Sequence, residues 1–167
     1  MEHLETHRSF VSYIDRSREY YAAQGYDKPY AWPHYDNVPF TPLRKPLSER
    51  RVGLITTAGK PKPVNPMENI MYLREVYAEP AIPSPPSLYT DDLFWDKKTT
   101  HTKDVDSFLP LNRLAEYARN GRIGSVSPRF YGVPTDYSQG RTMERYGPQI
   151  LQWCREDGLD AVLLSAL

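Results

Sequence analysis

The stretch Gly158-Leu159-Asp160-Ala161-Val162-Leu163-Leu164-Ser165-Ala166-Leu167 is a short apolar run that follows a glycine and ends the sequence. A glycine at this point is typical of a helix end, and the run itself is typical of a parallel strand buried on both faces. In open sheets of parallel strands, ligands bind just beyond the carboxyl ends of the strands. The stretch therefore predicts a core strand whose carboxyl end marks the candidate site, and the sequence stops there.

A second apolar run lies about one hundred residues earlier, as Arg51-Val-Gly-Leu-Ile-Thr-Thr-Ala-Gly59. Small residues after the run predict a turn at residues 59 to 63, so the carboxyl end of this strand is a second natural ligand position. Weaker patterns predict two more strands, one near residues 70 to 77 and one near residues 93 to 100.

Three segments have the spacing of helices. Residues 4 to 23 carry a possible apolar stripe and are followed by Gly25 as a stop signal. Residues 107 to 121 combine a serine cap, a proline in the first turn and a terminal glycine. Residues 143 to 158 repeat apolar positions at helical spacing, and Pro148 predicts a kink or a late start.

Alternating strands and helices predict the α/β fold class, a reduced doubly wound sheet. We expect a mostly parallel sheet with helices on both faces, plus an N-terminal helix and a Pro/Tyr-rich extended arm. The domain prediction places that helix and arm in residues 1–50 and the α/β domain in residues 51–167, packed as one compact unit. The 16 prolines and 13 tyrosines favour ordered, extended connections.

Composition excludes several classes of function. Lysine plus arginine and aspartate plus glutamate both number 21, so net charge does not favour nucleic acid or an anionic membrane as a partner. No apolar run approaches the roughly 20 residues of a membrane span, and the first residues lack a secretory pattern, which predicts a cytoplasmic protein. The single cysteine, Cys154, excludes an internal disulfide and a cysteine-built zinc site.

The turn Thr56-Thr57-Ala58-Gly59-Lys60 has two interpretations. Its hydroxyls, amides and lysine could bind an anion at the end of the strand. It matches neither the dinucleotide-binding glycine pattern nor the phosphate-binding loop, because a second glycine and a trailing hydroxyl are absent. A tight turn after a buried strand is therefore the favoured interpretation.

A second candidate is the segment in which His101 precedes Asp104 by three residues and Asp106 by five. A carboxylate can orient an imidazole that acts as a general acid or base, or the three side chains can bind a divalent metal with low specificity. The alternative is that the two carboxylates cap the entry to the helix at Pro110, and this alternative is favoured.

Other chemistry-bearing residues have simpler interpretations. Trp32, together with Tyr26, Tyr30 and Tyr35, could form an aromatic cage for an ammonium group, although such rings more often fix a proline-rich arm to the body of a protein. Cys154 falls on the apolar face of the last helix and is expected to be a small buried hydrophobe. We predict no metal site, since the terminal histidine pair is poorly supported by the chain around it.

Several motifs, in order and spacing, resemble the selenoprotein B family, which comprises the glycine, sarcosine, betaine and D-proline reductases. The resemblance covers roughly residues 50 to 167. Its motifs are Arg51-Val-Gly-Leu-Ile-Thr-Thr-Ala-Gly59, His101-x-x-Asp104, Leu109-Pro110-Leu111-Asn112-Arg113-Leu114, Gly121-Arg-Ile-Gly124-Ser125 and Asp157-Gly-Leu-Asp160-Ala-Val-Leu-Leu164.

The resemblance implies a selenol- or thiol-dependent reductase that cleaves a carbon–nitrogen bond of a small amino acid or amine. In that family a selenocysteine, or a cysteine, follows the last strand and attacks the carbon next to the amine. Here the sequence stops at Leu167, where that redox residue is expected. The ending resembles a reading frame closed at a selenocysteine codon, and a family member that has lost its redox half is the alternative. No other cofactor is implied.

By the same resemblance, His101 is the proton donor or substrate anchor, and Asp104 orients it or binds the ammonium group. Thr57 and Gly59 line the substrate site, and the cage interpretation adds Trp32. The implied partners are a small amine or amino acid, other reductase subunits and a thioredoxin-like electron donor, with a homo-oligomer left open. The alternative function is a non-catalytic module of the same fold that binds a small amine or another subunit.

Overall fold

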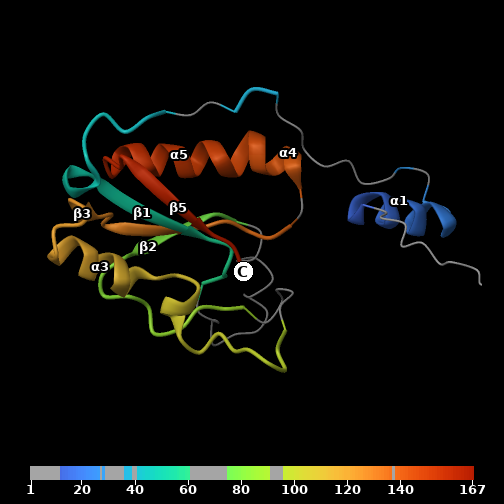
Figure 1. The fold of residues 1–167 in the computed structure, drawn as a ribbon, viewed down its shortest axis with the longest axis horizontal. Coiled ribbons are helices and arrows are strands. Elements are labelled where there is room, and N and C mark those ends of the chain that lie inside the picture. Colours follow the sequence, from blue (N-terminus) through green and yellow to red (C-terminus); the bar gives the residue numbers. More distant parts are fainter. Residues whose placement is uncertain are drawn as a thin grey trace, which may run out of the picture. The chain divides into compact units, whose positions relative to one another are not determined.

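The computed structural model describes residues 12–26, 28, 36–38, 41–60, 75–90, 96–136 and 138–167 (Figure 1). The chain divides into two compact units, Met1–Pro39 and Phe40–Leu167. The first unit contains helix α1 (Tyr13–Ala23), which follows the cap Ser12 and ends before Gly25, whose φ is +85°. The predicted stop at Gly25 is confirmed, and the predicted start of this helix lies outside the described residues.

The second unit is built on one sheet with a central strand, β1. Strands β3, β4 and β5 all pair with β1 in parallel, and β2 pairs with β4 in antiparallel orientation. The bounds are β1 (Arg51–Thr56), β2 (Tyr77–Pro80), β3 (Ser125–Val126), β4 (Arg129–Gly132) and β5 (Ala161–Ser165).

Strands β3 and β4 share one edge of β1, because β5 occupies the other edge from Val52 to Thr56. Val52 pairs with Val126, whereas Ile55 pairs with Tyr131, so the register shifts by two residues between these pairs. The shift is taken up at Ser127 and Pro128, where the Ser127 N–H still donates to the Val52 carbonyl at 2.8 Å. The order across the sheet is therefore β2, then β4 with β3, then β1, then β5.

Side chains alternate along β1 and divide the core into two clusters. Val52 and Leu54 pack with Leu111 and Leu114 of helix α3 (Leu111–Arg119), whereas Ile55 packs with helix α5 (Gly147–Glu156) on the opposite face. Figure 1 shows the two helices on opposite sides of the sheet. The predicted α/β class, with a mostly parallel sheet and helices on both faces, is confirmed.

The two predicted helices of this unit are also confirmed. Helix α3 begins after Pro110 and is followed by Gly121, whose φ is +68°. The predicted serine cap and first-turn proline are wrong, because the Ser107 hydroxyl donates to the Asp104 carbonyl and Pro110 stands before the first helical residue. The last helix is continuous with α4 (Gln139–Arg141) and a π-helical turn, η3 (Thr142–Tyr146), which leads into α5. Because Pro148 stands in the first turn of α5, it starts the regular helix after the π-helical turn. Two short 3-10 helices complete the elements, η1 (Leu47–Glu49) and η2 (Val105–Ser107).

The prediction that the last strand is buried on both faces is wrong. β5 forms as expected, but Val162, Leu163 and Leu164 are 38%, 49% and 77% exposed. Among the described residues β5 has a partner strand on one edge only, and the two helices leave its side chains uncovered. A sequence pattern reports the polarity of a strand, but not whether neighbouring elements are present to cover it.

The two weaker strand predictions agree less well with the structure. The strand predicted near residues 70 to 77 overlaps β2 only at Tyr77, where β2 begins, and residues 70–74 lie outside the described residues. The strand predicted near residues 93 to 100 is wrong from residue 96 onward. There the Asp96 carboxylate accepts from the Lys98 and Thr99 amides and stabilises a turn.

Gly124 allows the chain to enter β3 beside η1, and this gives a stability prediction. A Cβ at residue 124 would lie 2.7 Å from backbone atoms of Glu49 and Arg50. We expect Gly124→Ala to lower the free energy of unfolding by about 1–3 kcal/mol, measured by urea denaturation, because backbone atoms must move to accommodate it.

The matched control is Gly140→Ala in α4, where a Cβ would meet no atom within 4 Å. Alanine also favours helix over glycine, so this variant should unfold at the same urea concentration as the parent or a higher one. Equal destabilisation by the two substitutions would contradict the close approach at Gly124.

Candidate functional site

The carboxyl ends of β1, β4 and β5 lie at the same edge of the sheet, because the three strands are parallel. At this edge the Thr57 hydroxyl, just after the end of β1, binds the backbone of Leu167, just after the end of β5. Its oxygen accepts from the Leu167 N–H at 2.9 Å, and its O–H donates to the Leu167 carbonyl at 3.4 Å. Thr57 therefore fixes the backbone just beyond β5, 110 positions away in sequence.

Gly59 continues β1 into a contact with a distant segment. It pairs with Tyr89 through two backbone hydrogen bonds, of 2.8 and 3.0 Å. The next residue, Thr90, is buried, and its hydroxyl lies 2.7 Å from the Thr102 hydroxyl, adjacent in sequence to His101. The structure thus connects Gly59 with the His101 segment through Tyr89 and Thr90.

Tyr77, at the start of β2, fixes the turn between Thr57 and Gly59 by a hydrogen bond. The Tyr77 hydroxyl donates to the Ala58 carbonyl at 2.6 Å, and the ring is buried. Burial raises the pKa of Tyr77 well above its usual value, and the nearby Glu79 charge adds to the increase. The phenol therefore stays protonated and keeps its donor role.

These contacts decide between the two interpretations of the turn. The Ala58 N–H donates to the Thr56 hydroxyl, the Gly59 N–H donates to Tyr89, and the Lys60 ammonium pairs with Glu79 at 2.8 Å. The groups expected to bind an anion are thus bound within the protein. The structure favours the tight turn, and the substrate-binding roles of Thr57 and Gly59 stay predictions.

A loop after β4 adds a second polar cluster at this edge. The Asp136 carboxylate accepts from the Tyr146 hydroxyl and the Arg141 guanidinium, both at 2.7 Å, and from the Ser138 N–H at 3.0 Å. Burial alone would raise the pKa of Asp136, but these hydrogen bonds outweigh it and hold the pKa below its usual value. The loop and the start of the last helix are therefore fixed to each other.

His101 and Asp104 do not form a pair. Both are exposed, and within the described part of the chain no hydrogen bond or ion pair joins the imidazole to the carboxylate. The Asp104 carboxylate caps η2 by accepting from the Asp106 N–H, and the Asp106 carboxylate accepts from the Asn112 N–H at the start of α3. The capping interpretation is confirmed, and the catalytic roles of His101 and Asp104 stay predictions.

Asp104 also lines a cavity that sequence reasoning missed. The cavity has a volume of about 520 Å³ and lies between the segment from Ile82 to Pro86, which follows β2, and the side of α3. Lys103 and Arg119 line it with Asp104 and Asp106, so its charges are balanced. No local pattern could reveal it, because the two walls are far apart in sequence.

The remaining candidates add little to the site. Trp32 lies outside the described residues, as do Tyr30 and Tyr35, so the cage stays a prediction. Cys154 is buried, as expected, and burial, assisted by Asp157, raises the pKa of its thiol. Among the described residues no cluster of three or more histidine, cysteine, aspartate or glutamate side chains could hold a metal ion. No helix within the described ranges has the length and apolar character to cross a membrane.

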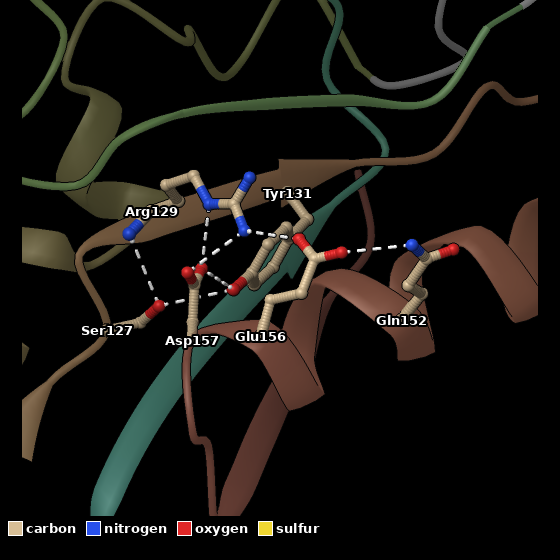
Figure 2. A network of polar contacts seen from close by, with 6 residues as sticks. All are labelled: Ser127, Arg129, Tyr131, Gln152, Glu156 and Asp157. Carbon is tan, nitrogen blue, oxygen red and sulfur yellow. Dashed lines mark hydrogen bonds and ion pairs between the residues drawn. The ribbon is translucent and has the colours of Figure 1, made fainter.

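The opposite, amino-terminal edge of the sheet holds the polar network in Figure 2. The Arg129 guanidinium, on the first residue of β4, donates to both oxygens of the Asp157 carboxylate at 2.8 and 2.9 Å. Tyr131 donates its hydroxyl to the same carboxylate, and Glu156 accepts from Arg129 at 3.3 Å. The network fixes the end of α5 to β4 and lies away from the edge that holds the candidate site.

A family comparison explains the order of the motifs. Residues 19–167 match the family model described as glycine/sarcosine/betaine reductase selenoprotein B. The chain belongs to this family. The expected extent, residues 50 to 167, is too short, because the match begins within α1 and includes the proline- and tyrosine-rich segment.

Curated relatives carry the names of reductase subunits. The chain is 26% identical, over 80% of its length, to the glycine reductase complex component B subunit gamma of Carboxydothermus hydrogenoformans. It is 28% identical, over 76% of its length, to the D-proline reductase subunit gamma of Acetoanaerobium sticklandii. These matches cover 32% and 52% of the two relatives, so the chain spans about a third to a half of their length. No solved structure matches the chain.

The contact between Thr57 and Leu167 gives a test of the candidate site. We expect Thr57→Val to remove both hydrogen bonds to Leu167, to lower the free energy of unfolding by about 1 kcal/mol and to speed amide exchange at residue 167. Hydrogen exchange followed by NMR measures this. Thr57→Ser retains the hydroxyl and is the control, so faster exchange in both variants would contradict the assigned role.

The network of Arg129 and Asp157 predicts a pH dependence. The hydrogen bond from Arg129, helped by that from Tyr131, holds the pKa of Asp157 below its usual value despite burial. A depressed pKa in the folded state stabilises the protein above the unfolded value, about 3.9, and this contribution is lost as the pH falls through the folded value.

Asp157→Asn should therefore lower the free energy of unfolding by about 2 kcal/mol at pH 7 and by much less at pH 2, measured by denaturant titration at each pH. Glu156→Gln is the control, because Glu156 is half exposed and contacts the same guanidinium. We expect it to change stability by less than about 1 kcal/mol at either pH. A loss for Asp157→Asn that is independent of pH would contradict the charge-based explanation.

Proposed function

We propose that this chain is a subunit, or part of a subunit, of a selenol- or thiol-dependent reductase. In this proposal the reductase reductively cleaves a carbon–nitrogen bond of a small amino acid or amine of the glycine, betaine, sarcosine or D-proline type. Family membership and the names of the relatives support the proposal. It places the protein in the cytoplasm, because a selenol or thiol needs a reducing compartment.

The observation that carries the proposal is the pair of hydrogen bonds between the Thr57 hydroxyl and the Leu167 backbone. A redox residue that acts as a nucleophile must be presented in a fixed position, since misplacement of reacting atoms costs rate steeply. Thr57 fixes the backbone just past β5 with two hydrogen bonds, and Ser165 donates its hydroxyl to the Phe108 carbonyl beside it. Two side chains thus hold the end of β5 to the turn after β1 and to the segment before α3.

A selenocysteine or cysteine beyond Leu167 would supply the nucleophile that displaces the nitrogen of the substrate. The residues of this chain would then position the substrate and move a proton. His101 is exposed on a segment connected to Gly59, which suits a donor of the proton taken up by the leaving amine. Asp104 is exposed and lines the cavity, which suits a carboxylate that binds an ammonium group.

The proposal is tested on the natural protein, purified from cells grown with radioactive selenium. We expect selenium in the protein, or a reactive thiol in addition to Cys154, together with a mass above the 19.3 kDa of residues 1–167. Intact-mass spectrometry and alkylation after reduction measure both. A protein of 19.3 kDa without selenium, and with Cys154 as its one thiol, would contradict the proposal.

The role of His101 is tested in the complete reductase with a dithiol as electron donor. We expect His101→Gln to lower kcat by roughly 100-fold, the usual contribution of a positioned proton donor. Lys98→Gln in the neighbouring turn is the control and should leave kcat unchanged. Equal rates for the His101 variant and the parent would remove His101 from the mechanism.

A second candidate is a non-catalytic module that binds a small amine or another subunit. It is favoured by the observation that Thr57, Gly59 and Lys60 all make contacts within the protein. Calorimetry of the purified chain with betaine, sarcosine, proline and glycine tests it, with Trp32→Ala as the variant. Binding that is weakened by this substitution supports the aromatic cage, and no binding by either form removes it.

A further inference from the structure

Strand β5 exposes apolar side chains on both of its faces. Val162 and Leu164 pair with Gly53 and Ile55 and lie on the α5 face, whereas Leu163 pairs with Leu54 and lies on the α3 face. Their exposed fractions of 38%, 77% and 49% contrast with those of β1, where Val52 and Leu54 are buried. The described sheet therefore extends one strand beyond the helices that cover it.

Within the described ranges, this edge lacks the features that protect a free edge strand. Natural proteins shield such strands with charged side chains, proline or a bulge, because free backbone groups and apolar side chains promote unwanted pairing. The seven residues Ala161–Leu167 contain no charge and no proline, and β5 pairs with β1 over its full length without a bulge. The strand has the composition of an inner strand of a parallel sheet.

A partner of β5 has to pair with its free backbone edge and also cover the exposed side chains on its two faces. This requirement restricts which polypeptide can be the partner. A parallel neighbour strand arrives with crossover helices that lie on the faces of the sheet. A second copy of this chain would offer its own β5, which brings no helix to either face. One strand–helix unit from a different stretch of polypeptide would pair with the backbone groups of the β5 edge through its strand and cover at least one face with its helix.

The length of the relatives identifies a source for such a unit. The matched region makes up 32% of one glycine reductase subunit and 52% of the D-proline reductase subunit. Each relative therefore carries at least about as much further sequence as the region that it shares with this chain, which is ample for a strand–helix unit of 30 residues or more.

We propose that β5 is an inner strand of a larger sheet, completed by a parallel strand and its helix from the reductase polypeptide that lies outside the stretch matched here. The partner is a strand with apolar residues on both faces, and it contacts Val162 and Leu164 on one face and Leu163 on the other. This inference rests on the proposed function only in naming the source of the partner strand.

The test is photo-cross-linking in the cells from which the gene comes, with the chain expressed from its own locus. A benzophenone amino acid is introduced at Leu164 in one strain, at Leu163 in a second and at Ile82 in a third. Ile82 is similarly exposed but follows β2, at the opposite edge of the sheet. We expect both β5 positions to cross-link to one peptide of the reductase polypeptide outside residues 1–167, and Ile82 to give no cross-link to it.

A variant separates docking from folding. Leu164→Lys should abolish the cross-link from Leu163, and it should leave the urea midpoint of the isolated chain unchanged because Leu164 is exposed there. A cross-link to a second copy of residues 1–167, a cross-link to an unrelated protein, no cross-link, or a cross-link that survives Leu164→Lys would each overturn the inference. Selenium and thiol content are measured separately. A protein that lacks a redox residue but still cross-links as expected would contradict the proposed function and leave this inference standing.

Discussion

The structure depends on the pairing of β1 along both of its edges. One edge pairs with β3 and β4 and the other with β5, so three other segments of the chain are fixed by one six-residue strand. Alternation along β1 then sends Val52 and Leu54 toward α3 and Ile55 toward α5. The position of each helix, and the meeting of the strand ends at the candidate site, follow from this one strand.

The elements that local patterns could predict are those with local causes. Helix α3 has an apolar stripe in its own sequence and a glycine just after its end, and β1 contains the apolar residues Val52, Leu54 and Ile55. The segment after residue 96 looked extended, but the Asp96 side chain bonds to nearby amides and forms a turn instead. The exposure of β5 depends on what lies beside it, and no pattern within the strand encodes that.

The contacts around the candidate site could not be predicted from local sequence. The end of a predicted strand indicates Thr57 and Gly59, the family resemblance adds His101, and the structure connects Gly59 with the His101 segment through Tyr89 and Thr90. The partner of Thr57, Leu167, is 110 positions away, and a contact at that separation leaves no mark on local spacing. The spacing and the resemblance suggest a pair of His101 with Asp104, whereas in the structure the Asp104 carboxylate caps η2.

The pairing of β1 with β5 also constrains the biosynthesis of the protein. A ribosome releases the chain from its amino end, so β1 emerges long before residues 161–165 can reach it. Throughout that interval β1 lacks its partner strand β5, and contacts between distant segments form slowly. The nascent chain is thus open to misassembly at this edge of β1 until β5 has left the exit tunnel.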